Sequence, residues 1–411
     1  MSTQHPTSST GHPAPGTAPG TRHPAPSTRE LLRIAHVAPV ATTIPPPKSG
    51  SVETMTSLLT EGLVARGHDV TLFATGDSTT RARLHAIYPH GYSHDPHMWP
   101  WELHELLNLA AAVERADRFD VIHYEAEYYP MSLAFSRLSP APLLQTLHYS
   151  PGQNEIGLWS QYPEAPFVAI SSEQRQRMHG LNVVATVLHA VDTDALTFRE
   201  QPDDYLLFLG RFTEGKGVVQ AIEIAQRVNL PLILAAAEND YYRDTVAPYV
   251  DGRRVIYAGE ADYAAKVKLL GGARALLYPV QSSEPFGLVL AEAMACGTPA
   301  AALDRGAVRE VVDDGVTGRI FAGVDDLVAG LPAVFALDRR RVRERAVARF
   351  GVERMVTEYE AVYRQLVSGP AKAEPHDQGV TGPATAGPHD RAASGPAEAG
   401  PRDRKADRAR Q

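Results

Sequence analysis

The chain lacks three features that define broad classes of protein. Its single cysteine, Cys296, excludes an internal disulfide and fits a reducing compartment. No apolar run is long enough to span a bilayer, and the first residues have no apolar core of the kind that a signal peptide carries. Basic residues are outnumbered, and the net charge of -8 argues against nucleic acid or an anionic membrane surface as the main partner. We therefore expect a cytoplasmic protein.

Both ends of the chain have the composition of disordered segments. Residues 1–29 are mostly Ser, Thr, Pro, Gly, Ala and His, and in residues 369–411 the tripeptide Gly-Pro-Ala recurs at Gly369, Gly382 and Gly395. Such tracts cannot bury enough apolar area to offset the loss of chain entropy on folding. We expect two disordered tails without chemistry.

Between the tails, strand patterns alternate with helix patterns, which is typical of parallel α/β sheets. We predict two doubly wound, Rossmann-like domains at 30–190 and 205–368, joined by a polar linker at 191–204 and facing each other across a cleft. Ligands of such sheets bind beyond the carboxyl ends of the strands. The candidate site residues are therefore those at predicted strand ends, namely His36, His123, His148, Arg211 and Glu284.

The strand predictions rest on short apolar runs bounded by turn residues. A first helix is predicted at 52–66, after a loop that contains three prolines and Gly50. The predicted strands are 31–39, 70–74, 120–123, 143–148, 205–210, 232–235, 254–257, 275–278 and 300–303.

Two carboxylates, Glu284 and Glu292, flank the start of a predicted helix in the second domain. The proline after Glu284 disfavours helical geometry there, so this residue belongs to a loop. Good helix formers follow Gly287, and Gly297 ends the helix. We expect Glu292 about two turns along this helix.

The first-turn amides of this helix, from Phe286, Gly287 and Leu288, are expected to be available to an anion. A polyol phosphate suits the arrangement, with its phosphate at the amides and its hydroxyls at the carboxylates. The plainer alternative is an amphipathic helix that carries two solvated glutamates.

The second domain opens with Gly210-Arg-Phe-Thr-Glu-Gly-Lys-Gly217, which allows three interpretations. The first is a phosphate-binding P-loop, although Gly217 stands where that motif has a magnesium-binding hydroxyl. The second is a diphosphate clamp made by the forked guanidinium of Arg211 and the ammonium of Lys216. The third is a structural pair with Glu214.

These two motifs, in this order, resemble those of the retaining glycosyltransferases of family 4, also called group 1, which have the GT-B fold. Further matches lie at 66–74, 168–171, 259–260 and 314–318, and the resemblance extends over residues 31–367. It implies that the first domain receives the acceptor and that the second binds a nucleotide-sugar donor.

For the second domain, the resemblance implies a role for each motif residue. Arg211 and Lys216 would contact the diphosphate, Glu284 the donor sugar and Glu292 the ribose. The backbone amides of Phe286, Gly287 and Leu288 would face sugar and phosphate.

For the first domain, the resemblance places His148 beside the reacting sugar carbon and the loop at Gly50 near the phosphate or acceptor. Two positions depart from the family pattern. Ser51 replaces the second of two paired glycines, and His189-Ala190 replaces an Asn-Gly pair before the linker. The first departure affects donor or acceptor geometry, and the second changes a turn.

Together, these expectations describe a retaining, metal-independent hexosyltransferase without a resident cofactor. The donor would be a UDP-, GDP- or ADP-linked sugar, and the acceptor a small soluble metabolite or a glycan, with membrane association disfavoured. No carboxylate can be nominated for a double displacement, so attack from the face of the departing phosphate fits better. The alternative is a catalytically weak sugar-nucleotide-binding or regulatory protein of the same fold.

Two other groups of residues in the first domain allow a functional interpretation. His85, His90, His94 and His97, with Asp95, contain ligand types for a metal, but their irregular spacing favours a loop without one. An aromatic and acidic set either stacks on an acceptor or packs within the domain. Its members are Trp99, Trp101, Tyr124, Glu125, Glu127, Tyr128 and Tyr129.

Overall fold

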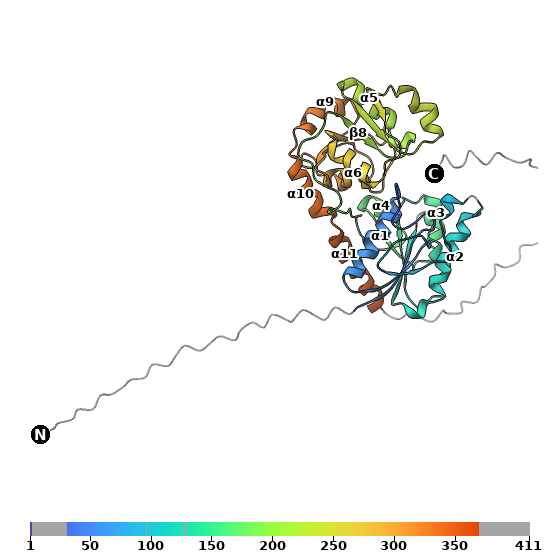
Figure 1. Cartoon of the computed structure of the whole chain (residues 1–411). Helices are drawn as coiled ribbons and strands as arrows, with labels where there is room; N and C mark the ends of the chain where they lie inside the picture. The colour runs from blue at the N-terminus through green and yellow to red at the C-terminus, as the bar shows by residue number, and fades with distance from the viewer. Residues whose placement is uncertain (2–30, 96, 127–128, 370–411) are drawn as a thin grey trace, which may run out of the picture. The chain divides into compact units, whose positions relative to one another are not determined.

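The structure is a computed structural model that describes residue 1 and residues 31–95, 97–126 and 129–369. The tails predicted at 1–29 and 369–411 lie almost wholly outside the described residues, as do Glu127 and Tyr128. The described part contains two parallel sheets with helices on their faces (Figure 1).

The first sheet has seven parallel strands in the order β3-β2-β1-β4-β5-β6-β7. The strand patterns predicted for this domain are all present, but several boundaries differ, and one of these differences affects the site. The strand predicted to end at His123 continues to Ala126, so His123 and Glu125 both lie inside it. The strands are β1 Arg33–Val37, β2 Asp69–Phe73, β3 Arg83–His85, β4 Val121–Ala126, β5 Leu143–Leu147, β6 Pro166–Ala169 and β7 Asn182–Thr186.

Alternation along these strands gives the first sheet two differently covered faces. On one face, Ile34 and Leu144 pack with the apolar stripe of α1 (Ser51–Ala65), whose buried residues recur every three or four positions. On the other face, Val37 and Leu143 pack with α2 (Trp101–Val113). Two shorter helices, α3 (Gln153–Trp159) and α4 (Ser172–Arg177), follow β5 and β6.

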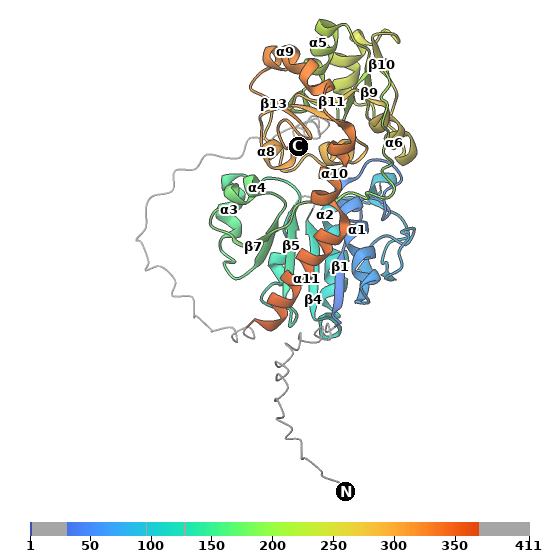
Figure 2. The same ribbon diagram turned by 90° about the vertical axis from the view of Figure 1, so that its left-hand side faces the viewer.

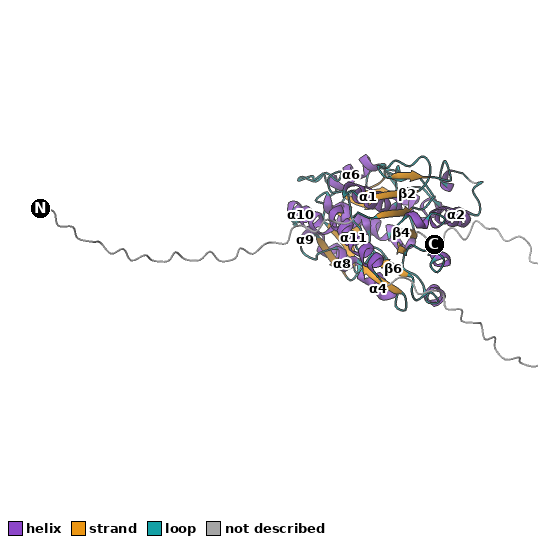
Figure 3. Cartoon of the chain, turned by 90° about the horizontal axis from the view of Figure 1, so that it is seen from below, coloured by secondary structure: helices purple, strands orange, loops and turns teal. Residues whose placement is uncertain are grey.

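The second sheet has six parallel strands in the order β10-β9-β8-β11-β12-β13. Its strands are β8 Leu206–Leu209, β9 Leu232–Ala235, β10 Val255–Tyr257, β11 Ala275–Tyr278, β12 Ala300–Leu303 and β13 Gly318–Phe321, which confirms every strand predicted here. One face packs on α5 (Val218–Val228) and α9 (Val324–Phe335). The other packs on α6 (Tyr263–Gly272), α7 (Leu288–Ala295) and α10 (Arg339–Phe350). Figure 3 shows the strands of the described chain flanked by helices.

The last helix, α11 (Val352–Ser368), belongs to the core of the first domain, although it follows the second domain in sequence. Figure 2 shows it lying along β1, β4 and β5, and its residues Met355 and Tyr363 share a cluster with Ile34. A buried bond between His68 Nε2 and Glu360 Oε1, 2.6 Å long, fixes it there. The prediction that 205–368 forms the second domain is therefore wrong for this helix, because sequence order alone does not show which sheet a helix covers.

Candidate active site

Glu284 lies between β11 and α7, on the loop predicted for it, and forms an ion pair with Lys216. Both side chains are less than a quarter exposed. Lys216 ends a short 3-10 turn after β8, so the contact joins the carboxyl ends of two neighbouring strands. The interpretation that paired the Lys216 region with Glu214 is thus replaced by a pair between the two motifs.

Gly287 begins α7 with a positive φ of 85°, a conformation that glycine adopts without strain. A Cβ at this position would lie 2.7 Å from the hydroxyl oxygen of Tyr278, so the close approach also requires glycine. Burial and the nearby carboxylate of Glu284 raise the pKa of Tyr278 well above its usual value, which keeps the phenol neutral. Tyr278 therefore presents a neutral hydroxyl beside the Glu284 loop.

Glu292 lies in the second turn of α7, which begins at Leu288, directly after Gly287 as predicted. Its carboxylate accepts a hydrogen bond of 2.6 Å from Nζ of Lys266 on α6. Sequence reasoning missed Lys266. An ammonium on the preceding helix gives no local signal, since only the packing of α6 on α7 brings it to Glu292.

Arg211 follows β8 and is exposed. Within the described part of the chain, no hydrogen bond or ion pair engages its guanidinium, so all of its donors are open to a ligand. Lys216 and Arg211 therefore differ in the free protein, because the lysine is held by a carboxylate and the arginine is not.

Gly217 decides between the P-loop and the clamp. Its φ is 75°, and a Cβ there would lie 1.9 Å from the carbonyl oxygen of Pro279. No serine or threonine fits this position, so the magnesium-binding hydroxyl of a P-loop is excluded by the backbone. The diphosphate clamp of Arg211 and Lys216 stays a prediction.

Phe286 and Leu288 combine a structural role with the predicted one. The Phe286 ring is buried and meets the ring of His189 edge to face at 5.1 Å. Leu288 is partly buried against the cores on both sheets. Of the amides at the start of α7, that of Leu290 donates to the carbonyl oxygen of Gly287 at 2.9 Å, whereas among the described residues no hydrogen bond engages those of Phe286, Gly287 and Leu288.

His148 follows β5, and its imidazole is turned into the protein, with 4% of the side chain exposed. Nε2 lies 2.8 Å from Oε2 of Glu125, and Nδ1 lies 3.4 Å from Nε2 of His189. The residue as a whole is more exposed than its side chain, so its accessible part is largely main chain. The ring predicted to lie beside the reacting carbon is therefore engaged at both nitrogens.

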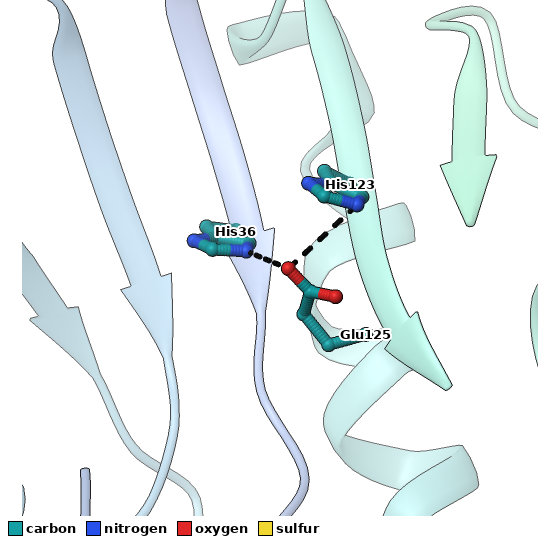
Figure 4. Close-up of side chains that lie close together, drawn as sticks. All are labelled: His36, His123 and Glu125. Carbon is teal, nitrogen blue, oxygen red and sulfur yellow. Dashed lines mark hydrogen bonds and ion pairs between the residues drawn. The ribbon is translucent and has the colours of Figure 1, made fainter. Parts of the chain in front are cut away.

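Glu125 is the centre of a buried polar cluster that joins three strand segments. Oε1 lies 2.8 Å from Nε2 of His36 on β1 and 3.7 Å from Nε2 of His123 on its own strand (Figure 4). Burial opposes ionisation of this carboxyl, but His123 and the hydrogen bonds from His148 and His36 outweigh it and lower its pKa well below the usual value. Glu125 is thus a buried carboxylate, which accepts hydrogen bonds and donates none.

The histidines of this cluster have partners that leave little room for a metal ion between them. His36 Nδ1 lies 2.7 Å from Thr60 Oγ1. The two ring nitrogens of His123 form hydrogen bonds of 2.8 Å with the hydroxyl groups of Tyr363 and Thr146. Ligands of one ion each lie about 2.0–2.2 Å from it, which sets them more than a hydrogen-bond length apart. The contact between His36 and Glu125 is a hydrogen-bond length, so this cluster is a hydrogen-bonded network.

The alternation of the strand contained a signal for this network. His123 and Glu125 are two residues apart on β4, and therefore face the same side as their β1 neighbour His36. Ending the strand at His123 concealed this relation and placed Glu125 in the aromatic set instead. Of that set, Tyr124 is buried, whereas the rings of Trp101 and Tyr129 stack at 6.4 Å with Tyr129 40% exposed.

Gly50 lies immediately before α1 and is required by crowding. A Cβ there would lie 2.8 Å from Oε2 of Glu53 and 2.9 Å from the Pro46 ring. Ser51 is exposed at the first position of α1, so the departure from paired glycines does not fill the crowded space. Burial raises the pKa of Glu53, and a hydrogen bond from its own backbone amide partly offsets the rise.

The histidine group at 85–97 does not assemble into a site. His85 ends β3 and packs on the ring of Phe73, whereas His90 lies 3.2 Å from the Asp77 carboxylate. Among the described residues, the one group of metal-ligand types that lies close together is His36, His123 and Glu125, which contains none of these histidines.

Two family models match adjacent parts of the chain. "Glycosyltransferase Family 4" matches residues 52–194, and "Glycosyl transferases group 1" matches residues 195–348. The chain belongs to the group 1 glycosyltransferases. Both matches fall within the predicted region of resemblance, and they divide inside the predicted linker at 191–204.

The names of curated relatives of this glycosyltransferase describe different reactions. The phosphatidyl-myo-inositol mannosyltransferase of Mycobacterium leprae is 27% identical over 257 residues, covering 56% of this chain and 67% of that protein. The N-acetyl-alpha-D-glucosaminyl L-malate synthase of Bacillus anthracis is 24% identical over 374 residues, covering 78% and 95%.

Solved structures confirm the predicted GT-B fold. AviGT4, a glycosyltransferase involved in Avilamycin A biosynthesis, superposes with a TM-score of 0.64 at 23% identity, covering 82% of this chain and 99% of that one. Anabaena HepE in complex with UDP-glucose gives 0.62 at 16% identity, covering 81% and 100%. Among the described helices, none has the length and apolar character to cross a membrane.

Proposed function

We propose that this glycosyltransferase moves a hexosyl group from a nucleoside-diphosphate sugar to a small soluble acceptor, with retention of configuration and without a metal. The observation that carries the proposal is the ion pair of Lys216 with Glu284 on the loop before α7, with Arg211 following β8, the strand that pairs with β11. It combines donors for a diphosphate with a carboxylate for sugar hydroxyls. The UDP-glucose complex of HepE supports a nucleotide-sugar donor.

The chemistry asked of these residues is stabilisation of negative charge on the departing nucleotide. Contacts from a guanidinium, an ammonium and helix amides strengthen as that charge grows, and one such donor lowers the barrier by roughly 3–4 kcal/mol. Arg211 supplies a guanidinium whose donors no other described residue uses. Lys216 supplies a positive charge, and its ion pair with Glu284 orients its side chain. Such a site needs no metal to neutralise the leaving group.

Retention by a double displacement requires a carboxylate that is free to attack the sugar. Glu125, the carboxylate nearest His148, is buried and accepts bonds from His36 and His148. Glu284 is paired with Lys216. These engagements support front-face attack, in which the departing phosphate takes the acceptor proton.

The acceptor is proposed as a small soluble molecule, and the compartment as the cytoplasm. The net charge of -8 disfavours an anionic membrane. The L-malate named for the Bacillus anthracis relative is an acceptor of this kind, whereas the mycobacterial name points to a lipid. The exposed Tyr129 ring beside Trp101 offers an aromatic surface for such a molecule.

The test begins with thermal unfolding in the presence of UDP-, GDP- and ADP-linked sugars, since a ligand of the folded state raises its stability. The donor that raises the melting temperature is then incubated with candidate acceptors, and proton NMR of the fresh product gives its anomeric configuration. We expect retention and activity that survives EDTA. An inverted product overturns the retaining assignment, and loss of activity with EDTA overturns metal independence.

A further inference from the structure

His148 is held on two sides by buried side chains from different elements. On the ring side, Nε2 of His148 forms a hydrogen bond of 2.8 Å with Oε2 of Glu125 on β4. On the main-chain side, Gln174 of α4 donates from Nε2 to the carbonyl oxygens of Leu147 and Tyr149, at 2.9 and 2.8 Å. The residues before and after His148 are thus tied to one amide group.

The ring contact fixes the protonation pattern of the histidine. An ionised carboxylate only accepts, so Nε2 of His148 carries the proton that faces Glu125. In the neutral ring, Nδ1 is then an acceptor, and it faces Nε2 of His189 at 3.4 Å. A flipped or rotated ring would lose the Glu125 contact inside a buried site.

The main-chain contact is equally complete. Gln174 is fully buried, and its carbonyl oxygen accepts from the backbone amide of Ile170 at 2.7 Å. Both donors and the acceptor of this side chain are therefore used, and a rotation of the amide group would break all three bonds. Ser171 caps the start of α4 and fixes the Gln174 backbone through a bond of 3.0 Å.

We propose that Glu125 and Gln174 are positioning residues for glycosyl transfer: Glu125 fixes the tautomer and orientation of the His148 ring, and Gln174 fixes the main chain on either side of it. The inference rests on the proposed function and on the position beside the reacting carbon that the family resemblance implies for His148. Neither residue touches the substrate. Each acts by holding the accessible main chain of His148, whose ring is buried, at one place beyond the end of β5.

The two contacts predict different dependence on the histidine itself. We compare Glu125→Leu and Gln174→Met, alone and with His148→Ala, by the rate of nucleoside diphosphate release from UDP-, GDP- and ADP-glucose with water as the acceptor. Glu125→Leu should lower kcat about 100-fold alone and less than 3-fold when His148 is already alanine. Gln174→Met should lower it at least 10-fold in both backgrounds, because it acts on the main chain. KM for the donor should change less than 3-fold.

Two further variants serve as controls. Glu125→Gln keeps one acceptor for His148 and should retain kcat within about 10-fold of wild type. Gln145→Met removes a buried amide from β5 that is bonded to Ser132 and not to His148, and should leave kcat unchanged. If Glu125→Leu lowers kcat equally with and without the His148 side chain, the ring contact does not position His148. The same conclusion follows if kcat of Glu125→Gln is as low as that of Glu125→Leu. A kcat of Gln174→Met within twofold of wild type would overturn the role of Gln174 in holding the main chain at His148.

Nitrogen NMR of the imidazoles tests the ring contact without any turnover. In wild type and in Glu125→Gln, which keeps an acceptor for the ring, His148 should carry its proton on Nε2, and in Glu125→Leu this tautomer should become mixed. A pure Nε2 tautomer in Glu125→Leu, or a mixed tautomer in Glu125→Gln, would overturn the role of Glu125. If wild type releases nucleotide from no donor, the proposed function fails, whereas the tautomer still decides whether Glu125 orders the ring.

Discussion

Lys266 Nζ donates to Glu292 Oε1 across 2.6 Å, and the two side chains come from neighbouring helices, α6 and α7. Each glutamate of the Glu284–Glu292 motif therefore has its own lysine, since Glu284 is paired with Lys216. The carboxylates are held in place before any donor arrives, which reduces the ordering that binding requires.

The pair at Glu292 predicts a role for Lys266 in nucleotide binding. Lys266→Met should weaken binding of the nucleoside diphosphate by roughly 1–3 kcal/mol, because it leaves a mostly buried carboxylate without its donor. Isothermal titration measures the affinity. Lys268→Met is the matched control, since Lys268 is an exposed lysine on the same helix. If Lys266→Met and wild type bind the nucleoside diphosphate with equal affinity, Lys266 has no role in nucleotide binding.

The diphosphate clamp predicts large kinetic effects. Arg211→Ala and Lys216→Ala should each slow turnover at saturating donor by roughly 2–4 kcal/mol of barrier, because each removes a contact that strengthens in the transition state. Steady-state kinetics provides the measurement. Arg243, an exposed arginine paired with Asp240, gives the control Arg243→Ala. Near wild-type turnover of both clamp variants would show that the diphosphate lies elsewhere.

The two glutamates should divide the donor between them. Glu292→Gln should weaken the free nucleoside diphosphate by roughly 1–3 kcal/mol, because glutamine accepts at one oxygen only. Glu284→Gln should leave that affinity equal or higher, since it frees Lys216 for the diphosphate, while use of the full donor falls. Titration with nucleotide and with donor separates these effects. Equal weakening of the free nucleotide by both variants would contradict the division.

Sequence alone predicted the sheets and the second-domain motifs because both depend on local patterns. Short apolar runs bounded by turn residues defined β8 to β12, and Gly287 and Gly297 delimited α7. Lys266, Gln174 and the position of α11 were not predictable in this way. Each depends on which elements pack together, as when α11 returns to the first sheet through the contact of Glu360 with His68. Glu125 was missed for a different reason, a strand boundary drawn three residues short.

The buried histidines predict acid sensitivity of the fold. Burial lowers the pKa of His123 to about 3, despite the opposing charge of Glu125, and burial lowers the pKa of His189 well below its usual value. In the unfolded chain, both titrate near 6.5. Between that pH and the lowered folded values, the unfolded state binds more protons, so the free energy of unfolding falls as the pH falls.

Each such group contributes up to about 1.4 kcal/mol per pH unit. We therefore expect urea midpoints to decrease steadily below pH 6.5, well before carboxylates titrate. His123→Gln keeps polar atoms for Tyr363 and Thr146 but does not titrate, so its stability should fall less steeply between pH 6 and pH 5. His97→Gln replaces an exposed histidine and should follow wild type. Identical slopes for His123→Gln and wild type would show that His123 is not held neutral in the folded protein.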